Sequence, residues 1–404
     1  MAPGPIATGS KRVNGIQDIE TPVPAVKAVC CGTPYEMGLA QGDALKEKIC
    51  AARRSLSALE AFRLAQPGWL PYPAYRRIAE SKSAKFLNRA FLNSDKGGQQ
   101  RLAGLAAGAR VPFRQICLFN ALEPLLSSAA GCTACPGACS AVAVTGRRSR
   151  TGEPIIARNF DYLPLVQPFY IIRECRPIGG YRSLEFTTAP MAGTVDGINE
   201  TGLSITYDYA FATDAPAQPA APISFAIAAA LANCRTVKEA ASCISKSLRW
   251  GGGLLMLADA DGMIASLELS NTRSFLRWPD NNESQLFHTN AFCSDALRAV
   301  QIADDAIYTN KAPSPLRGRR LHESSECRDS RLLELLDRAE ALDADALTAI
   351  MADHGHDGVP GNNSPCVHSD YWFTTACLQF FPKTRSMRVS YSTACAAEFC
   401  QFEF

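Results

Sequence analysis

Two short β-type runs separated by a polar turn constrain this 404-residue chain more than any other feature. The first run is Cys139-Ser-Ala-Val-Ala-Val-Thr145, and the second is Ile155-Ile-Ala-Arg-Asn-Phe-Asp-Tyr162. The segment between them contains two glycines and a proline, which is typical of a turn. β-Branched runs of period two around such a turn predict a β-hairpin. Cys139 then lies at the open end of the hairpin, with Arg158 and Asp161 returning beside it.

The predicted hairpin brings a thiol, a guanidinium and a carboxylate within reach of one another. A cation near a cysteine favours the thiolate, which is the nucleophilic form. A carboxylate can hold and orient an amine or imidazole that acts as a base. These groups together predict a nucleophilic site. Two structural alternatives stay open, because a lone cysteine in a strand usually belongs to the core, and Arg158 and Asp161 could form an ordinary ion pair.

The charge balance and the hydropathy of the chain argue against nucleic-acid and membrane partners. Forty-one Lys and Arg residues oppose 39 Asp and Glu residues, which gives a formal net charge of +2 and no basic footprint. No stretch approaches about eighteen uninterrupted apolar residues, and the first residues lack the apolar segment of a secretory signal. We therefore expect a soluble, cytoplasmic protein in which most of the 16 cysteines are reduced.

The pattern of residues divides the chain into three regions. Residues 1–28 are rich in proline, glycine and threonine and indicate a flexible leader. Residues 29–138 are mainly helical in pattern, and a capping box at Thr33 and Glu36 begins one long amphipathic helix. Further helices are expected over 75–93, 99–109 and 112–127. Residues 139–404 switch to strands and form the predicted core.

The pattern of residues 139–404 predicts an α+β fold. Besides the hairpin, strands are expected near 168–175, 181–187, 202–209, 254–258, 263–269, 372–381 and 387–391. Helices are expected over 222–233, 236–248 and 329–353. Strands and helices come in groups and do not alternate, so we expect two antiparallel sheets covered by helices, and not a parallel βαβ fold.

Seven motifs in order resemble those of the N-terminal nucleophile (Ntn) hydrolases, over roughly residues 28 to 404. Within that group the chain is similar to the penicillin acyltransferase-like branch (isopenicillin-N acyltransferase), and more distantly to choloylglycine hydrolases. The motifs are Gly32–Gly42, Leu102–Ala109 with Asn120 and Glu123 after it, the Cys139 hairpin, Gly197–Leu203, His288–Asn290, Ser324–Arg328 and Cys366–His368.

The resemblance implies an αββα sandwich that is made as an inactive precursor. The chain would cut itself between Ala138 and Cys139, and the small helical fragment (about 1–138) would stay bound to the large one (139–404). The freed α-amine of Cys139, with a reference pKa of about 7.7–8.0, can then serve as the general base. The implied activity is that of an amidohydrolase or acyltransferase that works through a Cys139 thioester. No cofactor and no metal are implied.

The remaining catalytic roles also come from the resemblance. Arg158 would polarise the thiol, Asp161 would orient the α-ammonium, and Asn290 would supply an oxyanion-hole donor. Arg328 matches the arginine of the relatives' Ser-Ser-x-x-Arg motif. Asp208 stands where relatives carry an active-site asparagine, although a carboxylate donates no hydrogen bond unless it is protonated. Further candidates for the site are Asn159, Tyr207 and Arg331.

Other interpretations of the same residues stay open. The nucleophile could be Cys132, which follows a glycine and precedes a threonine as at the junction of the fungal acyltransferase. Alternatively, Cys132, Cys135 and Cys139 could bind a metal in a structural protein. The fourth ligand would then be one of His354, His356, Cys366 and His368. For the enzyme, the substrate is expected to be a small amide or acyl donor, with acyl-CoA as one option from the family.

Overall fold

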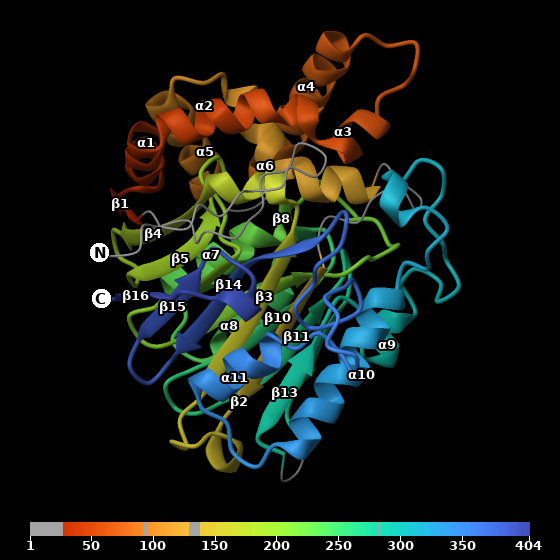
Figure 1. Cartoon of the computed structure of the whole chain (residues 1–404). Coiled ribbons are helices and arrows are strands. Elements are labelled where there is room, and N and C mark those ends of the chain that lie inside the picture. The colour runs from red at the N-terminus through yellow and green to blue at the C-terminus, as the bar shows by residue number, and fades with distance from the viewer. Residues whose placement is uncertain (1–26, 93–95, 129–137, 281–282) are drawn as a thin grey trace, which may run out of the picture.

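Two face-to-face β-sheets form the centre of the computed structural model, which describes residues 27–92, 96–128, 138–280 and 283–404 (Figure 1). In spatial order, the eight-stranded sheet contains β1 (Lys27–Gly32), β4 (Tyr170–Pro177), β5 (Ser183–Thr188), β6 (Asp196–Asn199), β7 (Ser204–Tyr209), β10 (Gly253–Ala258), β11 (Ile264–Leu269) and β12 (Ser274–Arg277). The six-stranded sheet contains β13 (Gln285–His288), β2 (Ala138–Val144), β3 (Ile155–Tyr162), β14 (Phe373–Phe381), β15 (Ser386–Ser390) and β16 (Cys400–Glu403). Neighbouring strands in both sheets are antiparallel, except that β1 pairs with β4 in parallel.

Helices cover the outer face of each sheet. The helices α7 (Ile223–Asn233) and α8 (Val237–Lys246) pack on the eight-stranded sheet, and α10 (Glu323–Arg338) and α11 (Ala344–Met351) pack on the six-stranded sheet. The core between the sheets contains side chains of both, such as Ala141 and Met256. The expected αββα sandwich is therefore confirmed. The short parallel pair of β8 (Ala221–Pro222) and β9 (Arg249–Trp250) and the short helix α9 (Asp295–Arg298) complete the core.

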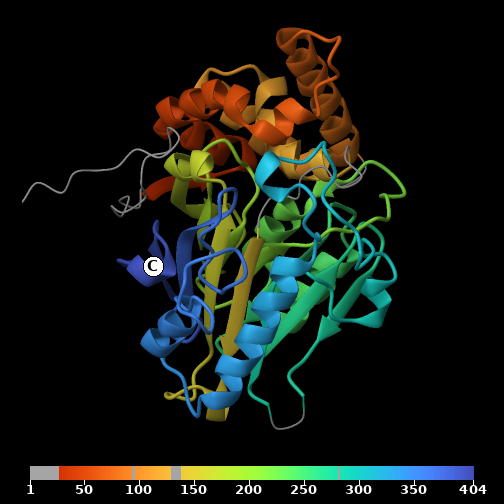
Figure 2. The ribbon, with the colours of Figure 1, turned by 45° about the vertical axis from the view of Figure 1, so that its right-hand side comes forward.

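A group of helices closes one end of the sandwich, at the top of Figures 1 and 2. It consists of α1 (Pro34–Ala44), α2 (Lys46–Ser55), α3 (Glu60–Leu64), α4 (Tyr72–Leu92), α5 (Lys96–Ala109) and α6 (Phe113–Ser128). The expected mainly helical region is thus present, although its division from the core at residue 138 stays a prediction. The expected flexible leader falls almost entirely outside the described residues. No helix that the structure describes is both long and apolar enough to span a bilayer.

Two helix predictions were wrong in extent. The single helix expected from Pro34 is broken at Leu45, whose φ of −114° lies outside the helical range, so that α2 leaves the direction of α1. The break lets α1 pack on α5 while α2 reaches the loop after β3, where Lys48 donates to the Pro168 carbonyl. The helix expected over 329–353 is two helices, because Asp343 caps a new one through its bond to the Ala346 N–H.

The predicted hairpin forms. Strands β2 and β3 pair in antiparallel register, with Ala138 opposite Asp161, Cys139 opposite Phe160 and Ala141 opposite Arg158. Directly opposed residues on neighbouring strands share one face of a sheet. Cys139 and Arg158 therefore point into the space between the sheets, whereas Ala138 and Asp161 face the other way.

A buried polar link attaches the helical region to the eight-stranded sheet. The Gln41 side chain of α1 accepts hydrogen bonds from Arg101 of α5 (3.0 Å) and from Arg173 of β4 (2.8 Å). Its amide nitrogen donates to the carbonyls of Ala189 (3.0 Å) and Met191 (2.8 Å). All four bonds are buried or partly buried, so each lost partner would leave an unpaired polar group inside the protein. Together with the β1–β4 pairing, they hold the helical region in place.

Glycines allow α1 and α5 to approach unusually closely. A Cβ atom added to Gly104 would lie 2.0 Å from the Tyr35 carbonyl oxygen, and one added to Gly108 would lie 2.2 Å from that of Leu39. Gly38 and Gly42 face α5 in the same way, with added Cβ atoms 2.2 and 2.5 Å from backbone oxygens. The two glycine-containing motifs of the sequence are thus the two sides of one helix contact.

We expect Gly104→Ala to destabilise the protein by about 1–3 kcal/mol, because the backbone of α1 must move to admit the methyl group. Gly68→Ala is the matched control, since a Cβ at Gly68 meets no atom within 4 Å. Thermal melts of both variants should show a clear decrease for Gly104→Ala alone. Equal melting temperatures in the two variants would contradict this account of the helix contact.

Candidate active site

Cys139 is the second residue of β2 and is 2% exposed. Its side chain points between the two sheets, at the end where the helical region closes them. Its thiol lies 3.3 Å from Nη2 of Arg158, the residue that the hairpin register brings to the same face. The predicted neighbourhood of thiol and guanidinium is therefore present.

Arg158 bridges the two sheets through a completely buried guanidinium. Nη1 donates to Asp196 of β6 at 2.6 Å, and Nε donates to Asp208 of β7 at 2.9 Å. Nη2 donates to the backbone carbonyl of Tyr207 as well as to the thiol. Arg158 thus forms ion pairs with Asp196 and Asp208. It does not form the ion pair with Asp161 that the hairpin alone could have produced.

The net effect of this environment on the Cys139 thiol differs from the sequence-based expectation. Burial raises the pKa of the Cys139 thiol well above its ordinary value, and the charge of Arg158 lowers it only in part. Asp208 adds to the increase, since a second negative charge nearby disfavours the thiolate. This environment therefore favours the neutral thiol over the thiolate.

Asn290 and Arg328 hold the backbone on both sides of the Cys139 side chain. The Cys139 N–H donates to Oδ1 of Asn290 at 2.7 Å, and Arg328 donates to the same oxygen at 2.8 Å. Arg328 also donates to the carbonyl of Cys139. Nδ2 of Asn290 donates to the Tyr209 carbonyl at 2.8 Å, which occupies one of its two N–H groups.

Asp161 lies directly opposite Ala138, beside the predicted cleavage site. Its Oδ1 accepts a hydrogen bond from the Thr374 hydroxyl at 2.6 Å, and its buried Oδ2 has no such partner among the described residues. Burial raises the pKa of Asp161 to about 7, against the opposing charge of Arg328. The carboxyl group can therefore change its protonation state near neutral pH.

Of the other predicted candidates, two lie beside Arg158 and two lie elsewhere. Tyr207 and Asp208 contact Arg158 as described. Asn159 points away from the thiol and donates to the carbonyls of Met351 and Pro365, both at 2.8 Å. Arg331 pairs with Asp353 at 2.8 Å on another face of α10, so Arg328 is the arginine of this motif that reaches Cys139.

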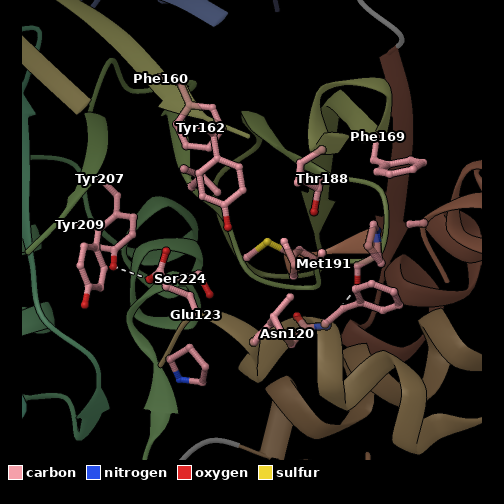
Figure 3. A pocket seen from close by; sticks show the side chains of 18 of the residues that line it. Asn120, Glu123, Phe160, Tyr162, Phe169, Thr188, Met191, Tyr207, Tyr209 and Ser224 are labelled. Atoms are coloured by element: carbon pink, nitrogen blue, oxygen red, sulfur yellow. Dashed lines mark hydrogen bonds between the residues drawn. The ribbon is translucent and has the colours of Figure 1, made fainter. Parts of the chain in front are cut away.

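A largely apolar pocket opens beside Cys139 and Arg158 (Figure 3). Its walls come from α2 and α6 of the helical region and from β3, β5, β7 and α7 of the core. Apolar lining residues include Leu56, Phe119, Phe160, Tyr162, Met191 and Ile223. A ligand in the pocket would contact both the helical region and the sheets.

Glu123 of α6 is the acidic residue of this pocket. Tyr207 donates its hydroxyl to Glu123 Oε1 at 2.6 Å, a contact that Figure 3 shows as a dashed line. Burial raises the pKa of Glu123 to about 7, although the bond from Tyr207 and the charge of Arg158 oppose this effect. Asn120, one turn earlier, has a structural role, because it bonds the Pro190 carbonyl and the Ala192 N–H.

Sequence reasoning missed three residues of this site. Asp196 precedes the Gly197 motif, and that position was the available signal, but no pattern shows that it pairs with Arg158. Thr374 lies in the predicted strand 372–381 without any motif. Glu123 was part of a quoted motif but had no role. All three meet the hairpin only through tertiary packing.

The alternative metal site falls partly outside the described residues, which do not include Cys132 and Cys135. Of its proposed fourth ligands, His356 contacts Arg331, at 3.2 Å. His354, Cys366 and His368 lie together near Cys395. The thiol of Cys139 itself contacts Arg158, which is not a metal ligand in this alternative.

Comparison with known proteins gives a family and several distant structural likenesses. Residues 148–377, more than half of the chain, match the family "acyl-coenzyme A:6-aminopenicillanic acid acyl-transferase". This match includes Arg158, Asp161, Asn290 and Arg328 and begins shortly after Cys139. No curated protein is a significant match.

Three solved structures with similar folds are distant in sequence. An orthologue of N-acylethanolamine-hydrolyzing acid amidase from Caenorhabditis elegans is 16% identical, with a TM-score of 0.40 over 61% of this chain and 93% of that one. The conjugated bile acid hydrolase of Clostridium perfringens is 13% identical, with a TM-score of 0.39 over 66% and 97%. Penicillin V acylase from Agrobacterium tumefaciens is 15% identical, with a TM-score of 0.35 over 66% and 86%.

The extent of the family match decides the assignment. The chain belongs to the acyl-coenzyme A:6-aminopenicillanic acid acyl-transferase family.

Proposed function

We propose that this protein is a cysteine amidohydrolase or acyltransferase that activates itself by cutting the chain before Cys139. One observation carries the proposal. The thiol of Cys139 lies against Arg158 beside an apolar pocket, while the N–H of the same residue is held by Asn290. Nucleophile and future base thus belong to one residue whose backbone is fixed on both sides.

Self-cleavage would begin with attack of the Cys139 sulfur on the carbonyl carbon of Ala138. The thiol proton passes to the departing backbone nitrogen, so the peptide bond is replaced by a thioester between Ala138 and the Cys139 side chain. Water then hydrolyses the thioester and leaves a new carboxylate on Ala138. The cut exposes the α-amine of Cys139, with Asp161 opposite the residue that has left.

Turnover would use the same sulfur against an external amide. The α-amine removes the thiol proton that burial otherwise retains, and the thiolate attacks the substrate carbonyl. The resulting α-ammonium, held by Asp161, returns the proton to the leaving amine. Asn290 is the proposed oxyanion donor through the second N–H of its Nδ2, because the first donates to the Tyr209 carbonyl. Water or an acyl acceptor then takes the acyl group from Cys139.

The pocket supports a small substrate with an apolar acyl group. Aromatic and aliphatic side chains form most of its wall, and such surfaces favour apolar groups of a ligand. Glu123 is the exception, and with a pKa near 7 it can accept or donate a hydrogen bond at neutral pH. Small amides and acyl donors, acyl-CoA among them, are the proposed substrate class.

We expect purified protein to contain two chains, the larger beginning Cys-Ser-Ala-Val, because the proposed thioester forms at Cys139. Intact-mass analysis and N-terminal sequencing check this directly. Cys139→Ala should remain one inactive chain, whereas Cys139→Ser should cut slowly and turn over far less, because a hydroxyl is the weaker nucleophile. A large fragment that begins at Cys132 would move the nucleophile there, and amidase activity in Cys139→Ala would exclude the proposed acyl-enzyme.

Asp161→Asn should separate chemistry from folding. Asparagine can still accept the Thr374 hydroxyl, so the melting temperature should stay close to that of the wild type. Loss of the charge that holds the α-ammonium should reduce cleavage, turnover or both by at least about tenfold, equal to about 1.4 kcal/mol. Arg158→Lys is the contrasting variant. It should lose stability as well, because breaking a buried ion pair costs about 3–5 kcal/mol. Full activity of folded Asp161→Asn would remove Asp161 from the mechanism.

Glu123 should make stability depend on pH in the uncut Cys139→Ala protein. Its folded pKa of about 7 lies above the reference value of 4.5, so the folded chain holds a proton that the unfolded chain has lost. The ionised group therefore costs stability progressively as pH rises from about 4.5 to about 7, and fully above pH 7. Adding Glu123→Gln removes this cost. Urea unfolding should show the gain from Gln near zero at pH 4.5, growing to pH 7 and constant beyond. A gain that does not change with pH would contradict the shifted pKa.

A further inference from the structure

Four metal-ligating side chains meet on the outer side of the six-stranded sheet, in segments that the proposed chemistry does not use. His354 follows α11, Cys366 and His368 lie in the loop before β14, and Cys395 lies in the short 3-10 helix Ala394–Ala396. One ligand atom from each of the four lies within 4.8 Å of the other three. Three segments between residues 354 and 395 thus bring two thiols and two imidazoles to one point.

The spacing of these atoms suits tetrahedral zinc. Zinc binds cysteine sulfur at about 2.3 Å and histidine nitrogen at about 2.0–2.1 Å, so tetrahedral ligand atoms lie about 3.3–3.8 Å apart. Nε2 of His368 lies 3.3 Å from the Cys366 sulfur and 3.5 Å from the Cys395 sulfur. Both distances fall inside this interval.

His354 gives independent evidence that a ligand is needed. Its Nε2 is buried and has no hydrogen-bond partner among the described residues. Its ring packs edge-on against His368, with centroids 5.0 Å apart. A buried ring nitrogen without a partner is costly, and coordination to a cation would satisfy it.

We propose that His354, Cys366, His368 and Cys395 bind one structural zinc ion. Two thiolates and two imidazoles form a closed tetrahedral set, which is typical of structural zinc and leaves no position for a substrate. A disulfide between the two cysteines would use neither imidazole. It would also leave Nε2 of His354 without a partner.

The zinc would fix the loop that supports the catalytic hairpin from behind. The N–H of Val367, between two of the ligands, donates to the Thr374 hydroxyl at 2.8 Å, and that hydroxyl donates to Asp161 at 2.6 Å. The carbonyl of Pro365 accepts from Asn159 of β3 at 2.8 Å. The ion would therefore stabilise the C-terminal segments and the position of Thr374 together.

Metal analysis of the full-length protein tests this proposal. Protein made with zinc in the medium and dialysed against metal-free buffer should retain about one zinc per chain. Strong chelation should lower its melting temperature, and replacement by Co²⁺ should give the visible spectrum of tetrahedral thiolate coordination. Both readouts use the wild-type chain, so they do not depend on whether a variant folds.

Variants locate the ion. Cys395→Ser, at an exposed position, should weaken zinc binding at least about tenfold, and His368→Ala should do the same. Cys400→Ser and His356→Ala are matched controls at exposed neighbouring positions and should keep the metal. Cys139→Ala should also keep it, which separates this proposal from the proposed enzyme activity.

Three results would overturn the zinc site. One is wild-type protein without metal in which both thiols react freely. Another is a mass lower by two hydrogens, with a disulfide between Cys366 and Cys395. The last is zinc that leaves when Cys132 or Cys135 is replaced but stays in Cys395→Ser, since that would place the metal at the other cysteine cluster.

Discussion

The buried guanidinium of Arg158 is the interaction on which the site depends. It is the point at which the six-stranded sheet meets Asp196 and Asp208 of the eight-stranded sheet. A buried charge is tolerated only when it is paired and its donors are satisfied, so the sheets can pack here in essentially one arrangement. That arrangement sets where the thiol lies, which carbonyl of β7 Arg158 binds, and where the pocket opens.

The same environment explains why the precursor would be inert. Burial keeps the Cys139 thiol protonated, and Arg158 shares its charge between two carboxylates and therefore cannot by itself produce a thiolate. An amine with a pKa of about 7.7–8.0 is suited to accept the proton. In the uncut chain that nitrogen is a peptide N–H bound to Asn290 and has no basicity. The proposed cut thus converts the Cys139 nitrogen from a peptide N–H into an amine, and the same amine would then serve as the base in the proposed catalysis.

Sequence patterns predicted what depends on neighbours along the chain. The hairpin register follows from the turn and from period-two alternation, so the meeting of Cys139 and Arg158 could be expected before any tertiary contact was known. The αββα class followed from the grouping of elements and the family resemblance. The break at Leu45 could not be predicted, because the apolar spacing continues through it and only the contacts of α1 and α2 with different partners require it.

Sequence patterns could not predict the contacts between the two sheets or between loops from different parts of the chain. Nothing near Asp196 indicates that it will face Arg158, since that pairing depends on how two separate sheets stack. The orientation of the Asn290 amide follows from Arg328 and Tyr209, which approach from different elements. Likewise, Cys366 and His368 were noticed as a motif, but Cys395 joins them only after β14 and β15 have folded back.

The parallel pairing of β1 with β4 has a consequence for the mature protein. Strand β1 belongs to the small fragment that the proposed cut would separate from the large one, yet it covers the edge of a sheet whose other strands belong to the large fragment. Without it, the backbone N–H and C=O groups of β4 would form an open edge, which invites pairing with other chains. After the proposed cut, the N-terminal piece would thus remain as a permanent edge strand that keeps the large fragment from pairing with other chains.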